Sequence, residues 1–332
     1  MAMQNIVDEG LAAGHDQLAN AHAQVTDFPE ADDAKSTQSQ HAQPQRAQAH
    51  DSRPCAVINQ RQVEASARHQ VPELTFLIST LDAGLYSVPR YDELPGARFL
   101  IVHQLSDPTM RKLYREHALA SFDSRFEYLA VEGRGLSKSR NIALAACATR
   151  YAYVLDDDVQ LHPQAVALVM EAFTCTEAAA ISFPHVKTFP LHERDPDRAA
   201  PPVAFKHHSL MTLARVRSVD MALDLCQFHA RFDEQFGLGT DQPSGEEFIV
   251  MSDARQQGAR LMRANLGIVA HAGVTSGSDF YSTPAKARTK GRMFARVTGS
   301  RFSPLSLAFF LRKAPVAFKH GYLKTFAGNF FR

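Results

Sequence analysis

The chain has 332 residues, of which 45% are hydrophobic, and its formal net charge is +1. This length and composition allow a substantial core in one large or two modest domains. The near-neutral charge argues against a general nucleic-acid binder, because proteins that follow a phosphate backbone usually carry a basic excess, so we expect no nucleic-acid partner.

The sequence predicts a cytoplasmic protein. Its four cysteines, Cys55, Cys147, Cys175 and Cys226, are widely separated and form no C-x-x-C pair. This spacing favours reduced thiols over a disulfide framework or a zinc site. The N-terminus has no basic region followed by an apolar run, so no signal peptide is expected. No stretch reaches the ~18 continuous apolar residues that a membrane span needs.

Residues 1–71 are rich in Ala, Gln, His, Asp and Ser and poor in large apolar residues. Such a segment buries too little apolar surface to offset its chain entropy, so we expect a disordered extension. Order is expected to begin with a β-branched, apolar strand at 74–80, which opens a domain spanning residues 72–279.

Strands and helices are predicted to alternate through this domain. The further strands are expected at 98–103, 126–131, 151–155, 179–184, 207–216 and 268–271. The helices are expected at 108–120, 136–147, 163–173 and 244–257, and a charged, Pro-rich loop at 190–202. This alternation predicts an α/β fold with a mostly parallel sheet and helices on both faces.

An apolar strand that starts at Tyr151 runs directly into three carboxylates, Asp156, Asp157 and Asp158. In open α/β sheets ligands bind just beyond the carboxyl ends of the strands. Because side chains alternate along a strand, Asp156 and Asp158 can point to the same side, about 6–7 Å apart. Such a pair suits a divalent cation that keeps water and phosphate in its shell. The alternative is a solvated acidic turn, in which mutual repulsion raises at least one pKa.

A glycine-flanked segment, Gly133-Arg-Gly-Leu-Ser-Lys-Ser-Arg-Asn141, precedes this strand. It places Ser137 and Arg140 in the first turn of a helix. Unpaired N–H groups and positive potential make a helix N-terminus a good seat for a diphosphate. The alternative is an ordinary serine-capped helix with solvated basic residues.

A second acidic cluster, Glu246 and Glu247, follows a loop in which Gly237 and Gly239 permit a tight turn close to a ligand. We expect one of these glutamates to be catalytic. The alternative is a capping box, in which Ser244 caps the helix and Glu247 bonds back to the cap backbone. His271 ends a later strand and is either structural or a ligand.

Five short motifs occur in a fixed order along the chain: Gly-Leu-Ser-Lys-Ser-Arg-Asn, Leu-Asp-Asp-Asp-Val, Phe-Asp-Glu-x-Phe-Gly-Leu-Gly, Gly-Glu-Glu and a strand-end His. Over residues 74–279 this order resembles family 2 glycosyltransferases of the Rossmann-like GT-A fold, and most closely the bacterial members that build surface polysaccharides. The resemblance implies a hexosyltransferase with a nucleotide-sugar donor, a saccharide or lipid-linked acceptor, Mn²⁺ or Mg²⁺, and inversion at the anomeric carbon.

The resemblance also implies roles for individual residues. Asp156, Asp158 and His271 correspond to the metal site, with Asp158 as the direct ligand. Glu247 corresponds to the general base and Glu246 to its acceptor-binding neighbour. The donor-binding positions are Thr80, Asp82, Ser137, Arg140, Asn141, Asp156, Asp157 and Gly239. The chain departs from the family's Pro-Thr-Tyr-Asn with Ser79-Thr-Leu-Asp82, and from its second-strand Asp with His103-Gln104, so the nucleobase stays open.

Two other functions compete with this interpretation. A haloacid-dehalogenase-type phosphatase or mutase also ends a strand in Asp-x-Asp, but it uses its first strand for this purpose, whereas here the motif falls on about the fourth. A non-catalytic binding protein could keep the fold, although it would have no need of both acidic clusters.

Residues 280–332 form a tail that is rich in Phe, Leu, Lys and Arg and contains no acid. At ~100° per residue, one arc of a helix would collect five basic residues, Arg312, Lys313, Lys319, His320 and Lys324. This arc favours peripheral attachment to the anionic inner face of the cell membrane, with an interruption at Pro315. The alternative is that Phe309, Phe310 and Phe318 pack on the catalytic domain.

Overall fold

A computed structural model of the protein describes residues 74–94, 96–189, 203–271 and 279–332. The predicted disordered extension at 1–71 and the predicted loop at 190–202 lie outside these ranges. Every described residue belongs to one compact unit of the chain.

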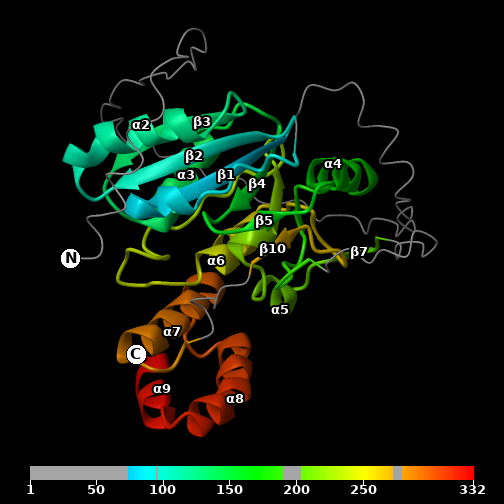
Figure 1. Ribbon diagram of the computed structural model, residues 1–332. Coiled ribbons are helices and arrows are strands. Elements are labelled where there is room, and N and C mark those ends of the chain that lie inside the picture. Colours follow the sequence, from blue (N-terminus) through cyan, green and yellow to red (C-terminus); the bar gives the residue numbers. More distant parts are fainter. Residues whose placement is uncertain (1–73, 95, 190–202, 272–278) are drawn as a thin grey trace, which may run out of the picture. The chain divides into compact units, whose positions relative to one another are not determined.

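The central sheet contains eight strands within the described ranges, in the order β3-β2-β1-β4-β8-β6-β9-β7. They are β1 (Leu74–Leu81), β2 (Arg98–Leu105), β3 (Phe126–Glu132), β4 (Tyr151–Leu155), β6 (Ala180–Ser182), β7 (Phe205–His207), β8 (Met221–Asp224) and β9 (Leu261–Ala264). Four of the seven neighbouring pairs are parallel, and β8 lies antiparallel between β4 and β6. The predicted mostly parallel sheet is therefore confirmed (Figure 1).

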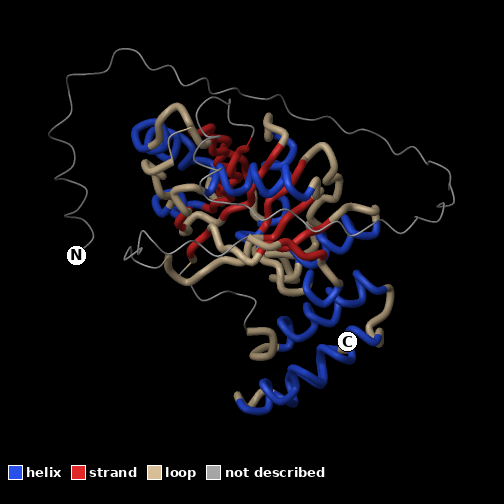
Figure 2. Tube along the Cα trace, turned by 90° about the vertical axis from the view of Figure 1, so that its right-hand side faces the viewer, coloured by secondary structure: helices blue, strands red, loops and turns tan. Residues whose placement is uncertain are grey.

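Helices cover both faces of this sheet (Figure 2). The helices of four or more residues in the described ranges, apart from one 3₁₀ segment, are α2 (Arg111–Ser121), α3 (Leu136–Ala146), α4 (Ala165–Thr176), α5 (Leu210–Leu213), α6 (Glu246–Gln256), α7 (Pro284–Thr298), α8 (Pro304–Lys319) and α9 (Leu323–Phe330). One hydrophobic cluster joins the sheet to α2 and α4 through Tyr114 and Phe173. A second cluster joins it to α3 and α6 through Leu144 and Ile249. None of these helices is long and apolar enough to cross a bilayer.

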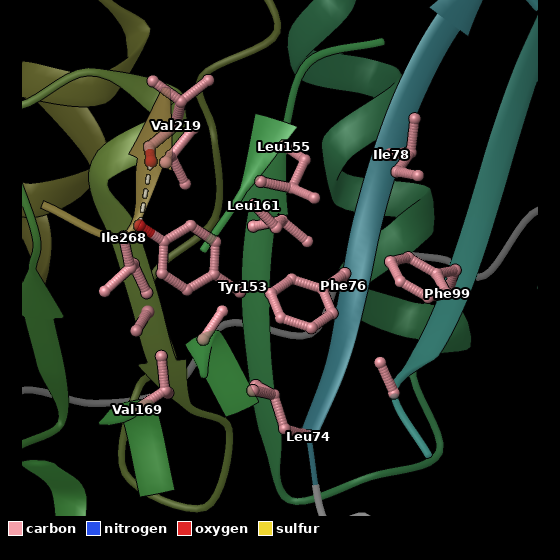
Figure 3. Packing of buried hydrophobic residues seen from close by; sticks show 14 of the residues in the cluster. Leu74, Phe76, Ile78, Phe99, Tyr153, Leu155, Leu161, Val169, Val219 and Ile268 are labelled. Atoms are coloured by element: carbon pink, nitrogen blue, oxygen red, sulfur yellow. Dashed lines mark hydrogen bonds between the residues drawn. The ribbon is translucent and has the colours of Figure 1, made fainter. Parts of the chain in front are cut away.

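Packing in the first cluster fixes the strand that carries the acidic residues (Figure 3). Phe76 of β1 stacks on Phe99 of β2, and its ring centroid lies 5.8 Å from that of Tyr153 in β4. The buried Tyr153 hydroxyl donates a hydrogen bond of 2.9 Å to the carbonyl of Val219, in the 3₁₀ helix η3 (Ser218–Asp220). This bond satisfies a hydroxyl that would be costly to bury alone. It also ties β4 to the segment that carries Ser218.

Two of the predicted strands are wrong in extent. The predicted strand at 207–216 ends at His207, and α5 follows because the Ser209 hydroxyl accepts a hydrogen bond from the Thr212 N–H and caps a helical turn. The predicted strand at 268–271 shortens to β10 (Val269–Ala270), which pairs with β5 (Gln160–Leu161) in a separate small sheet. Strands β8 and β9 were not predicted, because their places in the sheet are set by pairing with strands that are distant in the sequence.

The C-terminal helices α7, α8 and α9 contact one another, and α7 also packs against α6. Gly291 permits the approach of α9 to α7, since a Cβ at this position would lie 1.6 Å from the carbonyl oxygen of Phe330. Phe309 and Phe310 pack against the second hydrophobic cluster, whereas the Phe318 side chain is 71% exposed. The aromatic ring contacts of Phe309 and Phe310 in the described ranges are with phenylalanines of the same tail, so their packing on the catalytic domain stays a prediction. The predicted interruption at Pro315 is wrong, because α8 continues through it.

Candidate active site

The two acidic clusters line one cavity of about 1180 Å³. Asp156, Asp157 and Asp158 enter it from the carboxyl end of β4, and Glu246 and Glu247 enter it from the first turn of α6. Strand β8, which precedes α6 in the chain, runs antiparallel to β4, so the loop after β8 starts at the opposite edge of the sheet. Its contacts with the start of α3 and the ion pair of Arg140 with Glu246 hold the start of α6 at the cavity. The structure thus brings together the residues predicted to bind a metal and those predicted to activate an acceptor.

The three strand-end carboxylates have different environments. Asp157 accepts a 2.5 Å hydrogen bond from Thr80 at the end of β1, while burial and the neighbouring aspartates raise the pKa of Asp157. Asp156 accepts hydrogen bonds from Arg140 at 3.1 Å and from Ser218 at 3.2 Å. Asp158 is 53% exposed and faces His271. These three carboxylates are therefore suited to different tasks.

Asp158 and His271 are the residues best arranged to hold a divalent cation. Asp158 Oδ1 lies 3.3 Å from His271 Nε2, and both side chains line the cavity. Carboxylate oxygen and imidazole nitrogen are both ligands of divalent metals. Within the described ranges no three His, Cys, Asp or Glu side chains converge into a metal cage. Two protein ligands would leave other coordination positions for phosphate and water, as catalytic Mg²⁺ sites require. Asp156 fits direct ligation less well, because Arg140 and Ser218 already bond to its oxygens.

The buried Arg140 side chain contacts both acidic clusters. This side chain, only 2% exposed, lies 3.1 Å from Asp156, 3.1 Å from Glu246 and 3.7 Å from Glu247. A guanidinium offers several donors in a rigid plane, so one buried cation can compensate several carboxylates. Arg140 is not among the side chains that line the cavity. The structure therefore gives it a positioning role in place of the predicted contact with the donor.

The glutamate pair opens α6 without a capping box. Gly245, at φ +105°, is the N-cap residue, and no side chain bonds to the cap. The alternative interpretation of Ser244 and Glu247 is therefore wrong. Burial, together with the charge of Glu246, raises the pKa of Glu247, although Arg140 opposes this shift. Glu246 Oε1 accepts from Arg140, while Oε2 has no hydrogen-bond partner among the described residues.

Several predicted donor-binding residues hold the loop at 232–239 against the start of α3. Ser137 donates a 2.5 Å hydrogen bond to the Phe236 carbonyl, and the Leu136 N–H donates to the Leu238 carbonyl. The Asn141 amide bonds to both backbone groups of Phe232, at 2.9 and 2.8 Å. Neither Ser137 nor Asn141 lines the cavity. Gly135 and Leu136, at the start of the same helix, do line the cavity, so the diphosphate site expected at this helix start stays a prediction.

The remaining predicted donor residues divide between the cavity and its surroundings. Thr80 and Gly239 line the cavity. A Cβ on Gly239 would lie 3.0 Å from the backbone nitrogen of Gly135, so close packing explains this glycine. Asp82 lies outside the lining and accepts hydrogen bonds from the backbone and hydroxyl of Ser106, which lower the pKa of Asp82.

The prediction missed two groups of cavity residues. One is Ser218, whose hydroxyl holds Asp156. The other is a set of basic side chains: Lys290 of α7, Arg312 and Lys313 of α8, and His320 directly after α8. The acid-free composition of the tail was a visible signal. Which of its cations face the cavity depends on how α7 and α8 pack, and that information is not local to the sequence.

Comparison with protein families gives one match to this chain. The model of glycosyl transferase family 2 matches residues 80–223, from the end of β1 through the acidic end of β4 to β8. Residues 80–223 therefore match a family 2 glycosyltransferase domain. The resemblance stated from the motifs is confirmed at this level, together with the GT-A fold. Glu247 and His271 lie beyond the matched residues.

Solved structures that are similar to this chain include two that contain a nucleotide or a nucleotide sugar. TarS from S. aureus, residues 1–349 in complex with UDP, is 13% identical with a TM-score of 0.41. The similarity covers 67% of this chain and 65% of that one, so the chain spans about two thirds of that structure's length. A mannosyltransferase from Pyrobaculum calidifontis, in complex with GDP-Man and Mn²⁺, is 13% identical with a TM-score of 0.46 and coverages of 81% and 79%. No curated protein matches the chain.

Proposed function

We propose that the protein is a metal-dependent, inverting glycosyltransferase that moves a sugar from a nucleotide-sugar donor to a hydroxyl of a saccharide or lipid-linked acceptor. The observation that carries this proposal is the shared cavity of Asp158, His271 and Glu247 in a chain that matches a family 2 domain. Pockets for one small ligand usually enclose about 300–1000 Å³. A cavity of about 1180 Å³ has room for parts of two substrates.

The donor is assigned to the strand-end side of the cavity. Mn²⁺ or Mg²⁺ held by Asp158 and His271 would supply Lewis-acid stabilisation of the negative charge that develops on the departing nucleoside diphosphate. Asp157, fixed by Thr80, offers an acceptor for hydroxyl or amide groups of the donor. Ser218 and Arg140 hold Asp156 in place beside this site.

The acceptor is assigned to the side formed by α6. A hydroxyl is a poor nucleophile at neutral pH until a base removes its proton, and this assistance is typically worth ~10²–10⁴-fold in rate. Glu247 would accept that proton, and its raised pKa makes it a stronger base than an ordinary glutamate. The unpaired Oε2 of Glu246 can accept a hydrogen bond from a second acceptor hydroxyl. Direct attack by the activated hydroxyl on the face opposite the diphosphate gives inversion.

We assign the biological role to cell-surface polysaccharide or glycolipid synthesis at the cytoplasmic face of the membrane. The support for membrane attachment is the outer surface of α8 and α9, where Leu311 and Phe318 are 72% and 71% exposed and Lys324 is also exposed. Replacing Leu311 and Phe318 with Ser should reduce co-sedimentation with anionic vesicles. Unchanged co-sedimentation would remove the attachment from this proposal.

The proposal is tested by incubating the protein with a panel of nucleotide sugars with and without Mn²⁺. We expect nucleoside diphosphate to be released from one donor or a few, and EDTA to stop this release. A phosphatase would instead release inorganic phosphate from sugar phosphates. A non-catalytic protein would bind a nucleotide without turnover, and this result would contradict the proposal.

A further inference from the structure

The C-terminal helices bring basic side chains to the cavity that contains the proposed catalytic residues. Lys290 of α7 and Arg312 and Lys313 of α8 all line it. None of the acidic residues in the lining lies on α7, α8 or α9, because the chain has no acid after Asp279. The part of the cavity wall formed by these helices is therefore cationic.

Among the described residues these three cations have no carboxylate partner, whereas two neighbouring cations do. Within the described ranges, Lys290, Arg312 and Lys313 form no ion pair with a carboxylate, and Lys313 instead lies over the ring of Phe280 at 5.2 Å. In contrast, Lys286 pairs with Asp279. Arg296, also on α7, pairs with Asp233 and Asp253. Lys290, Arg312 and Lys313 thus face the cavity without a carboxylate partner in the described ranges.

Lys290 connects this cationic wall to the proposed base. Burial lowers the pKa of Lys290, the charge of Lys313 adds to this effect, and the charges of Glu247 and Glu246 oppose it. Lys290 therefore lies within electrostatic reach of both Lys313 and the glutamate pair. Two ammonium groups that approach each other in a partly buried site repel, and an anion between them would relieve that repulsion.

We propose that Lys290, Arg312 and Lys313 bind a phosphate or diphosphate ester carried by the acceptor. This inference rests on the proposed function and narrows its acceptor class. A cluster of three cations matches the multiple negative charge of a phosphate ester better than the single charge of a carboxylate, and guanidinium binds phosphate through paired hydrogen bonds. Lys290 lines the cavity together with Glu246 and Glu247, and its helix α7 packs against α6, so this anion is assigned to the acceptor side of the cavity.

The side chains next to these cations suggest what the phosphate is attached to. Leu305, Phe309 and Val316 of α8 line the same wall. Apolar groups beside a phosphate site suit an amphiphile, in which a phosphate joins the sugar to an apolar chain. A soluble sugar phosphate has the same anionic group without that chain, so the two can be compared directly.

The test measures binding of three probes by calorimetry: decyl phosphate, neutral decyl glucoside and glucose 1-phosphate. The wild-type protein should bind decyl phosphate more tightly than decyl glucoside. Lys313→Met and Lys290→Met should each weaken binding of decyl phosphate by about ten-fold or more, as expected for a lost charged hydrogen bond. Lys319→Met is the matched control, because Lys319 is exposed on α8 and does not line the cavity. It should leave binding unchanged.

Several outcomes would overturn the inference. The first is that the wild-type protein does not bind decyl phosphate. The second is that Lys313→Met and Lys319→Met weaken binding of decyl phosphate equally. The third is that Lys290→Met loses Mn²⁺-dependent binding of UDP and GDP, which would assign the cations to the donor. Equal affinity for glucose 1-phosphate and decyl phosphate would support the phosphate site but contradict the inference that the acceptor carries an apolar chain. Failure of every nucleotide sugar to react would overturn the proposed function but leave the probe-binding result intact.

Discussion

The wall of the cavity formed by the sheet and the wall formed by the C-terminal helices are built differently. On the sheet side each carboxylate has a partner: Thr80 for Asp157, Arg140 and Ser218 for Asp156, and His271 for Asp158. On the helix side Lys290, Arg312 and Lys313 have no carboxylate partner within the described ranges. The difference teaches that contacts within the protein hold the acids in place, whereas the cations of the helix side have no such carboxylate contacts in the described part of the chain, and this contrast is the basis of the proposed anion site.

The largest expected effect is that of Glu247→Gln on the rate of sugar transfer. The substitution keeps the size of the side chain but removes the base. Sugar transfer should fall by ~10²–10⁴-fold, because the acceptor hydroxyl keeps its proton. The measurement is the initial rate of nucleoside diphosphate release with acceptor present. Glu116→Gln, on the exposed surface of α2, serves as the control and should keep the wild-type rate. Full activity in Glu247→Gln would remove the base assignment.

Arg140→Met tests whether the acids depend on their shared cation. The substitution leaves Asp156, Glu246 and Glu247 near one another without compensation, so the free energy of unfolding should fall by about 3–5 kcal/mol. Urea denaturation measures this change. Arg111→Met, which breaks an exposed pair with Glu132, should cost about 1 kcal/mol or less. Equal losses in the two variants would contradict the role of Arg140.

The pH dependence of sugar transfer tests how Glu246 affects the pKa of Glu247 on the acidic side of the cavity. Glu247 must be ionised to accept a proton, so its raised pKa predicts a rate that increases with pH until the pH passes that pKa. Glu246→Gln removes a neighbouring negative charge that raises the pKa of Glu247. The acidic limb of the kcat/KM profile should therefore move to lower pH in this variant. A limb that stays in place or moves to higher pH would show that a different group titrates.

The smallest effect is expected from Gly291→Ala, which tests the packing that orders the cationic side. The added methyl group would collide with the carbonyl of Phe330, so we expect a loss of about 1–3 kcal/mol in stability. Gly328→Ala on α9 is the matched control, because a Cβ there meets nothing within 4 Å. Thermal melting compares the two variants. The control should melt at or above the wild-type temperature, since alanine favours helix.

Much of the fold could be predicted because its signals are local. The apolar runs of β1, β2 and β4 and the helical composition of α3 and α6 are complete within single segments, and the structure confirms these elements. The segment at 207–216 was predicted wrongly, because one serine cap outweighed its apolar content. Strand β8 was missed because its place between β4 and β6 is set by pairing with distant strands.

The candidate site shows the same division. Asp158 and His271 could be selected because they stand at strand ends, and Glu247 because it follows a glycine-containing loop within a recognisable motif; all three line the cavity. Ser137, Arg140 and Asn141 belong to the same motif, but tertiary packing turns their side chains toward the 232–239 loop and the acidic cluster, away from the cavity. A motif therefore locates a functional region more reliably than it says which of its side chains contact the ligand.

The most direct test of the central claim is Mn²⁺-dependent binding of UDP and GDP to Asp158→Asn and Glu247→Gln, measured by calorimetry. The account predicts that Glu247→Gln binds the nucleotide with wild-type affinity. It predicts that the Mn²⁺-dependent affinity of Asp158→Asn for the nucleotide falls by at least ~10-fold. This lower limit is the loss that follows removal of a residue that only hydrogen-bonds to a metal ligand. Equal binding by the two variants, with or without Mn²⁺, would contradict the division of the cavity into a metal-and-donor side and a base side.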